Sequence, residues 1–345
     1  PLVGVLADRR DRRRMLIAAD VLRVPAALGL CAAEVTGSPA LALAAVLVLA
    51  LLSTFFDPVA TAAVPSLVDP EDLETANAAV GGAWGAMLVV GAGLGGVVSA
   101  LFGHQVAFVV NAASFAVSAL LVAGIRRPMQ APRVAGVAAP WRAALQHQRA
   151  RPALLALLAS KPGIGVANGI VGVLPTLALL RFGAGEVGIG VLLAARGLGA
   201  MLGPLVAGAA WRRRRRGGAW LLTLCGGSIL LYAAAYALLP IAPGLAAAAA
   251  LIVVAHVGGG GQWSLSTIGL QVATPDALRG RVMALDFAIA TAAIGASSLL
   301  AALATELAGP SVAIWIEVGL VAAYGGGWLA LTRGLRRGEP LPELG

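Results

Sequence analysis

The stretch Gly4–Leu16, GVLADRRDRRRML, decides how the rest of the chain is interpreted. It places five arginines and two aspartates at the edge of a strongly apolar sequence. Such a run fits a phosphate-binding patch, a basic tail or a loop held on one side of a membrane. The placement of apolar and charged residues along the remaining chain separates these three possibilities.

The composition indicates a membrane protein. The 345 residues are 59% hydrophobic and 12% charged, with a mean hydropathy of +0.89. Soluble domains are roughly 45–50% apolar and about 25% charged. The formal charge is +9, but the arginines lie between apolar runs and no aromatic residues are interleaved with them. We therefore predict a lipid bilayer as the surroundings and no nucleic-acid partner.

Apolar runs near the roughly 20 residues that cross a bilayer core recur along the chain. We predict ten complete spans after a remnant that ends near Leu6. The spans are Met15–Ala33, Ala40–Ala62, Ala76–Leu101, Val106–Ile125, Ala153–Leu180, Val187–Trp211, Ala219–Leu239, Gly244–Val272, Met283–Leu307 and Ser311–Leu331. Cys31 and Cys225 fall inside these runs, which favours packing residues over a disulfide or a metal site.

The charges of the connecting loops predict the topology. Arginine and lysine accumulate on the cytoplasmic side of membrane proteins. Most alternate loops here are basic, such as the run Arg212–Arg216, whereas intervening turns such as Gly103–Gln105 carry no Arg or Lys. Two exceptions are the acidic loop Val68–Ala78 on the basic side and Arg181 on the other. We therefore predict a multi-pass protein of the inner cell membrane whose opening loop, central linker and C-terminus are cytoplasmic.

An internal repeat predicts two halves. The segments VDPEDLETANAA and ATPDALRGRVMA share Pro70/Pro275, Leu73/Leu278 and Ala79/Ala284, and each pair differs by 205 positions. We predict an N-terminal transmembrane bundle over 1–125, a cytoplasmic linker over 126–152, and a C-terminal bundle with a short tail over 153–345. Duplicated halves with Gly- and Pro-interrupted spans are typical of secondary transporters.

The opening stretch resembles the signature loop of the major facilitator superfamily, G-x-x-x-D-R-x-G-R-R, which joins that family's second and third helices. The matching residues are Gly4, Asp8, Arg9, Arg12 and Arg13. Asp11 stands where the family usually has its second glycine. The segments FFDPVATAAVPSLV at 55–68 and LETANA at 73–78 resemble the exporter branch that includes enterobactin-exporter-like proteins.

The resemblance implies an all-α polytopic membrane protein with two six-helix bundles, the first helix and most of the second being absent from this chain. It implies a secondary active transporter: a monomeric, proton-coupled exporter or antiporter of small amphipathic molecules, such as drugs or siderophores, that works by alternating access without a cofactor. A truncated, non-transporting sensor or scaffold is the alternative. No P-loop, G-x-S-x-G or H-E-x-x-H motif occurs, so neither an enzyme nor a metal site is predicted.

The resemblance also implies that the matched acid and arginines form a conformational latch on the cytoplasmic face of the N-terminal bundle. In the family the partner is an acid on the fourth span; Asp57 lies near the cytoplasmic end of that span, Ala40–Ala62 here, and we expect it to pair with Arg12. Asp8 is expected to face the start of the eleventh span in the family's count. The remaining arginines of the loop fit a role in topology alone.

Polar residues inside the spans are the candidates for a substrate or proton cavity, since such residues are costly and commonly functional. They are Lys161, Asn168, His256, Gln262, Trp263 and Glu317. Lys161 either lines a cavity or extends to the cytoplasmic surface. His256 and Glu317 fit proton exchange, and they equally fit structural hydrogen bonds. The four glycines at 258–261 predict an interrupted helix.

Glycine-rich spans predict close helix packing. In the fifth span of the family's count, Gly91, Gly95 and Gly96 match the antiporter signature G-x-x-x-G-P-x-x-G-G, while Ala92 replaces its proline. The eighth span comes closer to the pattern, with Gly199, Gly203 and Pro204. Asp20 and Arg23 are three residues apart and predict a neutralising pair on one helix face.

Overall fold

The computed structural model describes residues 10–91, 98, 101–130, 141–213 and 218–337. Every regular element within these ranges is helical. The chain divides into two compact units. Unit 1 comprises Pro1–Pro70, Gly91–Ala144 and Thr274–Leu285, and unit 2 comprises Glu71–Val90, Leu145–Ala273 and Asp286–Gly345.

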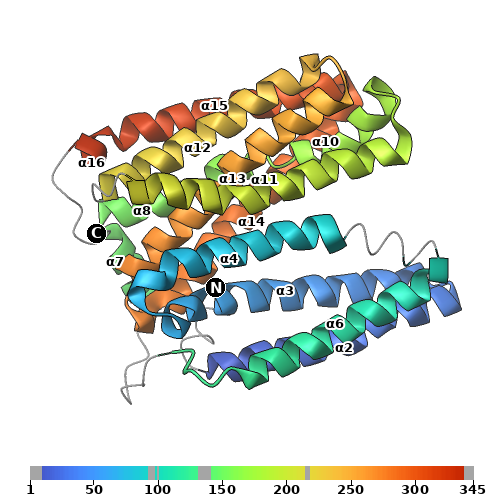
Figure 1. Ribbon diagram of the computed structural model, residues 1–345, viewed down its shortest axis with the longest axis horizontal. Helices are drawn as coiled ribbons and strands as arrows, with labels where there is room; N and C mark the ends of the chain where they lie inside the picture. The colour runs from blue at the N-terminus through green and yellow to red at the C-terminus, as the bar shows by residue number, and fades with distance from the viewer. Residues whose placement is uncertain (1–9, 92–97, 99–100, 131–140, 214–217, 338–345) are drawn as a thin grey trace. The chain divides into compact units, whose positions relative to one another are not determined.

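Unit 1 is built on α2 (Arg12–Thr36), α3 (Pro39–Leu67) and α6 (His104–Gly124), and α2 packs against both of the others (Figure 1). The Asp11 carboxylate caps α2 by accepting a hydrogen bond from the Arg14 amide at 2.9 Å. The helix ends at Gly37, whose φ of 62° is a left-handed value that glycine adopts readily. These end signals fix where the first described helix begins and ends.

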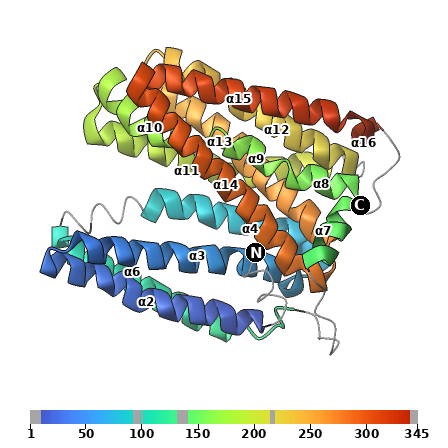
Figure 2. The same cartoon turned by 180° about the vertical axis from the view of Figure 1, so that it is seen from behind.

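Unit 2 holds most of the remaining helices, and Figure 2 shows α12 running beside α15. The helices that contribute to it are α4 (Leu73–Ala86), α8 (Pro152–Leu158), α9 (Lys161–Gly165), α10 (Ile170–Thr176), α11 (Gly185–Arg213), α12 (Gly218–Leu238), α13 (Leu245–Ala273), α15 (Pro310–Leu331) and α16 (Arg333–Arg337). Helix α14 (Asp276–Ala308) gives its first residues to unit 1 and the rest to unit 2. A short helix in the predicted linker, α7 (Trp141–Arg149), is basic at its end.

Nine helices of the described part of the chain are long and apolar enough to cross a membrane, judged by length and composition. They coincide with nine of the ten predicted spans. The tenth, Ala76–Leu101, begins within α4 and continues into a π-helical segment, Met87–Gly91, and several of its later residues lie outside the described ranges. Large apolar side chains such as Leu307 and Leu331 are exposed, as lipid-facing surfaces require.

The span Pro152–Arg181, which contains Pro162 and several glycines, is broken. Turns separate α8, α9 and α10, and the span ends in a π-helical segment, Leu177–Arg181. A broken span frees backbone groups that need polar partners inside the protein. The break therefore leaves backbone N–H and C=O groups in the interior of unit 2 that an unbroken helix would have hydrogen-bonded within itself.

The interruption predicted at glycines 258–261 is wrong, because α13 continues as a helix through all four. The glycines are close-contact positions instead. A Cβ on Gly258 would lie 2.7 Å from the Ser228 carbonyl oxygen, and one on Gly260 would lie 2.8 Å from that of Ala200. Close packing of neighbouring helices offsets the low helix propensity of glycine here.

Gly203 on α11 supplies a direct test of this packing. A Cβ there would lie 2.7 Å from both the Gly261 nitrogen and the Val257 oxygen, so we expect Gly203→Ala to cost about 1–3 kcal/mol of unfolding free energy. Gly227 on α12 has open space at its Cβ position, and Gly227→Ala should instead stabilise by about 0.5–1 kcal/mol. Unfolding in mixed detergent micelles measures both; equal effects of the two substitutions would contradict the packing.

Candidate functional site

A fully buried ion pair lies within unit 2, joining α9 to α14. Lys161 and Asp286 are both 0% exposed, and the lysine Nζ donates a hydrogen bond to Asp286 Oδ2. Nζ also donates to Thr267 Oγ1 of α13 at 2.9 Å. A buried pair is tolerated when further hydrogen bonds of this kind complete it. Lys161 therefore points into the bundle, and the alternative that it extends to the membrane surface is wrong.

Two aromatic rings flank this ammonium. Its Nζ lies 4.7 Å from the centroid of Trp263 and 5.5 Å from that of Phe287, distances at which a ring face attracts a cation. The two rings meet edge to face, with centroids 5.8 Å apart at 75°. Both side chains are half-buried. The fully buried ion pair is therefore bordered by two rings that are themselves partly accessible.

The same region contains two buried oxygen atoms without hydrogen-bond partners among the described residues: Asp286 Oδ1 and Gln262 Oε1. The Gln262 amide nitrogen is used, donating to Ser160 Oγ at 2.7 Å. An unsatisfied buried acceptor costs about 1–3 kcal/mol. The open oxygens are thus places where a proton, a water molecule or a ligand donor would be stabilising.

Glu317 of α15 forms a second buried polar site. Its Oε2 accepts a hydrogen bond from Ser297 Oγ at 2.5 Å, and Ser297 Oγ in turn accepts from the Gly169 amide at 2.7 Å. Within the described ranges no cation lies in ion-pair distance of Glu317. Asn168 is half-buried in the adjoining turn, and its side chain makes no hydrogen bond to another described residue. The turn between α9 and α10 is therefore linked through Ser297 to the buried carboxylate of Glu317.

His256 belongs to a separate aromatic cluster. Its Nε2 lies 2.9 Å from the Tyr236 hydroxyl, and its ring packs edge to face against Tyr232 with centroids 5.5 Å apart. Both tyrosines come from α12, and all three side chains are buried. This environment matches a structural hydrogen bond, which was one of the two interpretations of His256.

In unit 1, Arg12 is the centre of what we call the Arg12 network. The side chain is 1% exposed and donates to the Ala62 oxygen at 3.0 Å, the Met129 oxygen at 3.1 Å and Asp276 Oδ1 at 3.0 Å. Asp276 also pairs with Arg279 at 2.9 Å. One guanidinium therefore ties the end of α3, the segment after α6 and the start of α14 together.

The expected contact between Arg12 and Asp57 is not the one that the structure shows, since the carboxylate on Arg12 is that of Asp276. Asp57 is exposed, and no ion pair joins its carboxylate to a described residue. Arg12 does reach the carbonyl oxygen of Ala62. Asp57 lies five residues before Ala62 on the same helix, which is about 7.5 Å of helix rise. Asp57 lies too deep in its span for the pairing.

Of the other matched residues of the opening loop, only Arg13 lies within the described part of the chain. Arg13 donates to the Arg127 carbonyl oxygen at 3.0 Å. Gly4, Asp8 and Arg9 lie outside the described residues. Farther along α2, the Asp20–Arg23 pair is present at 2.8 Å, as its spacing predicts.

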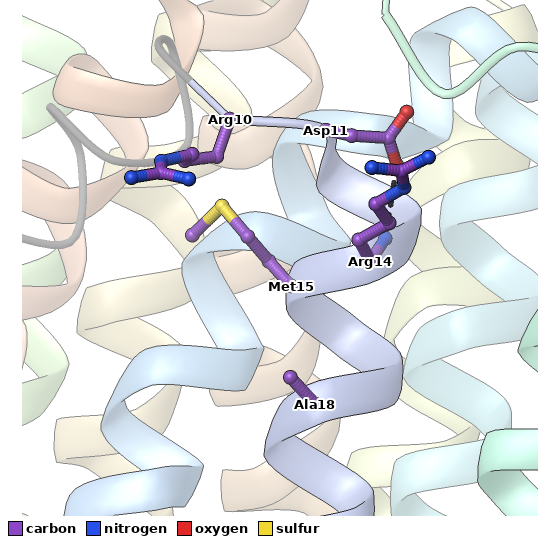
Figure 3. Close-up of a pocket in the computed structure, with 5 residues that line it drawn as sticks. All are labelled: Arg10, Asp11, Arg14, Met15 and Ala18. Atoms are coloured by element: carbon purple, nitrogen blue, oxygen red, sulfur yellow. Dashed lines mark hydrogen bonds between the residues drawn. The ribbon is translucent and has the colours of Figure 1, made fainter.

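An open depression of about 430 Å³ lies at the start of α2 (Figure 3). Its lining residues are Arg10, Asp11, Arg14, Met15 and Ala18. Figure 3 shows the side chains of Asp11 and Arg14 together on one side of Met15, with Arg10 on the other. Small-molecule sites are enclosed and mostly apolar. This charged surface feature does not match that description.

The glycines and proline of α11 lie at close helix contacts within unit 2. A Cβ on Gly199 would lie 2.4 Å from the Val253 oxygen of α13. Pro204 meets α4, since a Cβ on Gly81 would lie 2.5 Å from the proline Cγ. Gly91 ends the π-helical segment after α4, whereas Gly95 and Gly96 lie outside the described residues.

Several residues that the sequence pattern does not predict as site residues lie beside the predicted ones. They are Ser160, Thr267, Asp276, Asp286 and Ser297. A signal existed for Asp286, because it is an acid within a predicted apolar span. The serines and the threonine carry no comparable signal, since hydroxyl groups in membrane helices commonly bond to their own backbone.

Apolar helices of membrane-spanning length, with a charged pair buried among them, define a polytopic helical membrane protein. A sequence profile of the Major Facilitator Superfamily matches residues 1–288, and the chain belongs to that family. No curated protein sequence matches it.

Solved structures of similar fold include three transporters. The human organic anion transporter shares 20% identity at a TM-score of 0.78, with 95% of this chain and 79% of that one covered. A bacterial homologue of the iron transporter ferroportin, in an outward-facing state, shares 18% sequence identity at a TM-score of 0.73, with 96% of this chain and 86% of that one covered. The E. coli fucose:proton symporter shares 14% sequence identity at a TM-score of 0.69, with 94% of this chain and 86% of that one covered. At these identities the likeness shows the fold alone.

Proposed function

We propose that this transporter is a proton-coupled exporter of small amphipathic molecules that works by alternating access. The observation that carries the proposal is the Lys161–Asp286 pair, fully buried among polar and aromatic side chains with an open acceptor oxygen. Ionisable residues inside membrane helices are costly, and they mark substrate and ion pathways in transporters. Substrate would bind beside this pair, while the pair itself and Glu317 are the candidate proton-carrying groups.

Three further features support the finer parts of the proposal. The segments 55–68 and 73–78 resemble exporters of the enterobactin-exporter type. The basic loops favour an inner cell membrane topology with the linker 126–152 and the C-terminus in the cytoplasm. The Arg12 network gathers helix ends at the face that this topology makes cytoplasmic, which suits a latch on one conformational state. The working form is a monomer of two bundles, 1–125 and 153–345.

Flux through the purified protein in liposomes tests the proposal. Vesicles are loaded with ethidium, a rhodamine dye or a catecholate siderophore, and a pH gradient is imposed across the membrane. We expect at least one probe to move against the direction of proton flow, and a protonophore to abolish the movement. Flux that ignores the gradient contradicts proton coupling, and flux of no probe contradicts export of this substrate class.

Glu317→Gln should separate proton coupling from folding. The amide keeps an acceptor for Ser297 but cannot carry a proton, so we expect gradient-driven flux to fall by at least about tenfold. The free energy of unfolding should change by less than about 1 kcal/mol, because the hydrogen bond is retained. Glu306→Gln, at an exposed acid of α14, is the matched control and should leave flux unchanged. Equal flux from both variants would remove Glu317 from the coupling mechanism.

A further inference from the structure

The position of the Lys161 ammonium has the chemistry of a binding site for an organic cation. It is surrounded by the Asp286 carboxylate, the Thr267 hydroxyl at 2.9 Å, and the rings of Trp263 and Phe287 at 4.7 and 5.5 Å. A carboxylate with two aromatic rings is the combination that recognises alkylammonium groups. The chain's own lysine occupies a site that would suit a substrate of the same charge.

Charge balance limits what can enter this site. Lys161 and Asp286 are both 0% exposed, and together they carry no net charge. An added cation would leave an uncompensated buried charge, which is strongly unfavourable. A cation can enter at constant net charge when Lys161 gives up a proton. An anion, by contrast, can enter when Asp286 takes one up.

We propose that the substrate is an organic ammonium ion, which pairs with Asp286 between Trp263 and Phe287 while Lys161 releases one proton to water. One Nζ–H bond of Lys161 breaks, and its electron pair stays on the nitrogen. Asp286 remains a carboxylate, so the site holds one positive and one negative charge before and after the exchange. The inference rests on the proposed exporter function and names its substrate class.

Helices α12 and α15, which pack against α9, favour a cation over an anion. From α12, Cys225 lies within electrostatic range of Lys161. From α15, the Tyr324 hydroxyl donates to the Ala159 oxygen at 2.6 Å. The described residues of α12 and α15 include no lysine or arginine, so these two helices offer no second positive group that would hold an anion. Asp286 Oδ1 has no hydrogen-bond partner among the described residues, which leaves an acceptor for the incoming cation.

The exchange supplies a coupling rule for the proposed exporter. A cation and a proton alternate at one site, because binding either one displaces the other. Cation release on one side of the membrane would therefore accompany reprotonation of Lys161 on that side. This is the stoichiometry of a one-for-one antiporter.

Calorimetric titration of the detergent-purified protein with benzyltrimethylammonium tests the inference. The charge of this probe is fixed, so any proton released comes from the protein. Titrations in two buffers of different ionisation enthalpy count the protons. We expect one proton released per cation bound in the unmodified protein. Proton uptake, or binding without proton release, would overturn the inference.

Variants sharpen the test. Lys161→Ala removes the competing ammonium, so we expect binding at least about tenfold tighter with no proton release. The double substitution Lys161→Met with Asp286→Asn removes both charges and should not bind the probe. Lost binding in Lys161→Ala, or unchanged binding in the double variant, would overturn the inference. Trp263→Leu keeps the ion pair and replaces Lys161→Ala in the test if that variant does not fold. We expect Trp263→Leu to bind benzyltrimethylammonium about tenfold more weakly, and unchanged binding would contradict the proposal.

This measurement is separable from the proposed function because it needs neither vesicles nor a gradient. Cation binding with proton release, but no gradient-driven flux, would retain the site and refute the exporter. Conversely, other probes could show gradient-driven flux while benzyltrimethylammonium shows no binding that depends on Asp286. That result would refute the cation site and leave the exporter in place.

Discussion

Asp286→Ala is expected to lower the free energy of unfolding by about 3–5 kcal/mol, because it leaves the Lys161 ammonium buried without its counter-charge. The remaining partner, Thr267, supplies one neutral hydrogen bond and cannot replace a carboxylate. Unfolding in mixed detergent micelles, followed by circular dichroism, measures the loss. A loss below about 1 kcal/mol, the size expected of an exposed pair, would contradict the buried geometry.

The control for this prediction removes both charges together. Lys161→Met with Asp286→Asn leaves no uncompensated charge, and replacing a buried pair by neutral residues of similar size is often close to neutral for stability. The double variant should therefore recover most of the stability that Asp286→Ala loses. Equal losses in the two proteins would show that packing at position 286, and not charge, is responsible.

Arg12→Ala is the second substitution with a large expected effect. It deprives the Ala62 and Met129 carbonyls and the Asp276 carboxylate of a shared donor, and we expect a loss of about 2–4 kcal/mol in unfolding free energy. Arg12→Lys should recover only part of this, since an ammonium cannot reproduce the planar set of guanidinium donors. Thermal unfolding of the detergent-purified protein ranks the variants.

The neighbouring arginine gives a matched control for Arg12. Arg13 donates one exposed hydrogen bond, to the Arg127 carbonyl oxygen, so Arg13→Ala should cost less than about 1 kcal/mol. The two residues are adjacent in the same basic run, and substitution removes the same charge from each. A similar loss from both would show that net charge, and not the Arg12 network, accounts for the effect.

The spans and their order could be predicted from the sequence because membrane crossing requires a local property, a long apolar run. Lys161 could be identified as a site residue for the same reason, since one charge in such a run is conspicuous. Its partner is 125 residues away, on a helix whose packing no local pattern reveals. Pairing is a property of the three-dimensional arrangement, so Asp286 was not assigned to Lys161.

The two wrong predictions have related causes. The glycines at 258–261 suggested a broken helix, because intrinsic propensity ignores the neighbouring backbones that make glycine favourable there. Asp57 was assigned to Arg12 by resemblance to the family, without a measure of its depth along α3. The Arg12 side chain meets the carbonyl of Ala62 instead, one helical turn and more beyond Asp57.

The central claim is that the buried Lys161–Asp286 pair carries proton-coupled transport. Its most direct test compares flux driven by a pH gradient in liposomes that contain the unmodified protein or the variant Lys161→Met with Asp286→Asn. Circular dichroism and thermal unfolding first establish that the variant is folded. We predict gradient-driven flux from the unmodified protein and none from the folded variant. Equal gradient-driven flux from both would contradict the account.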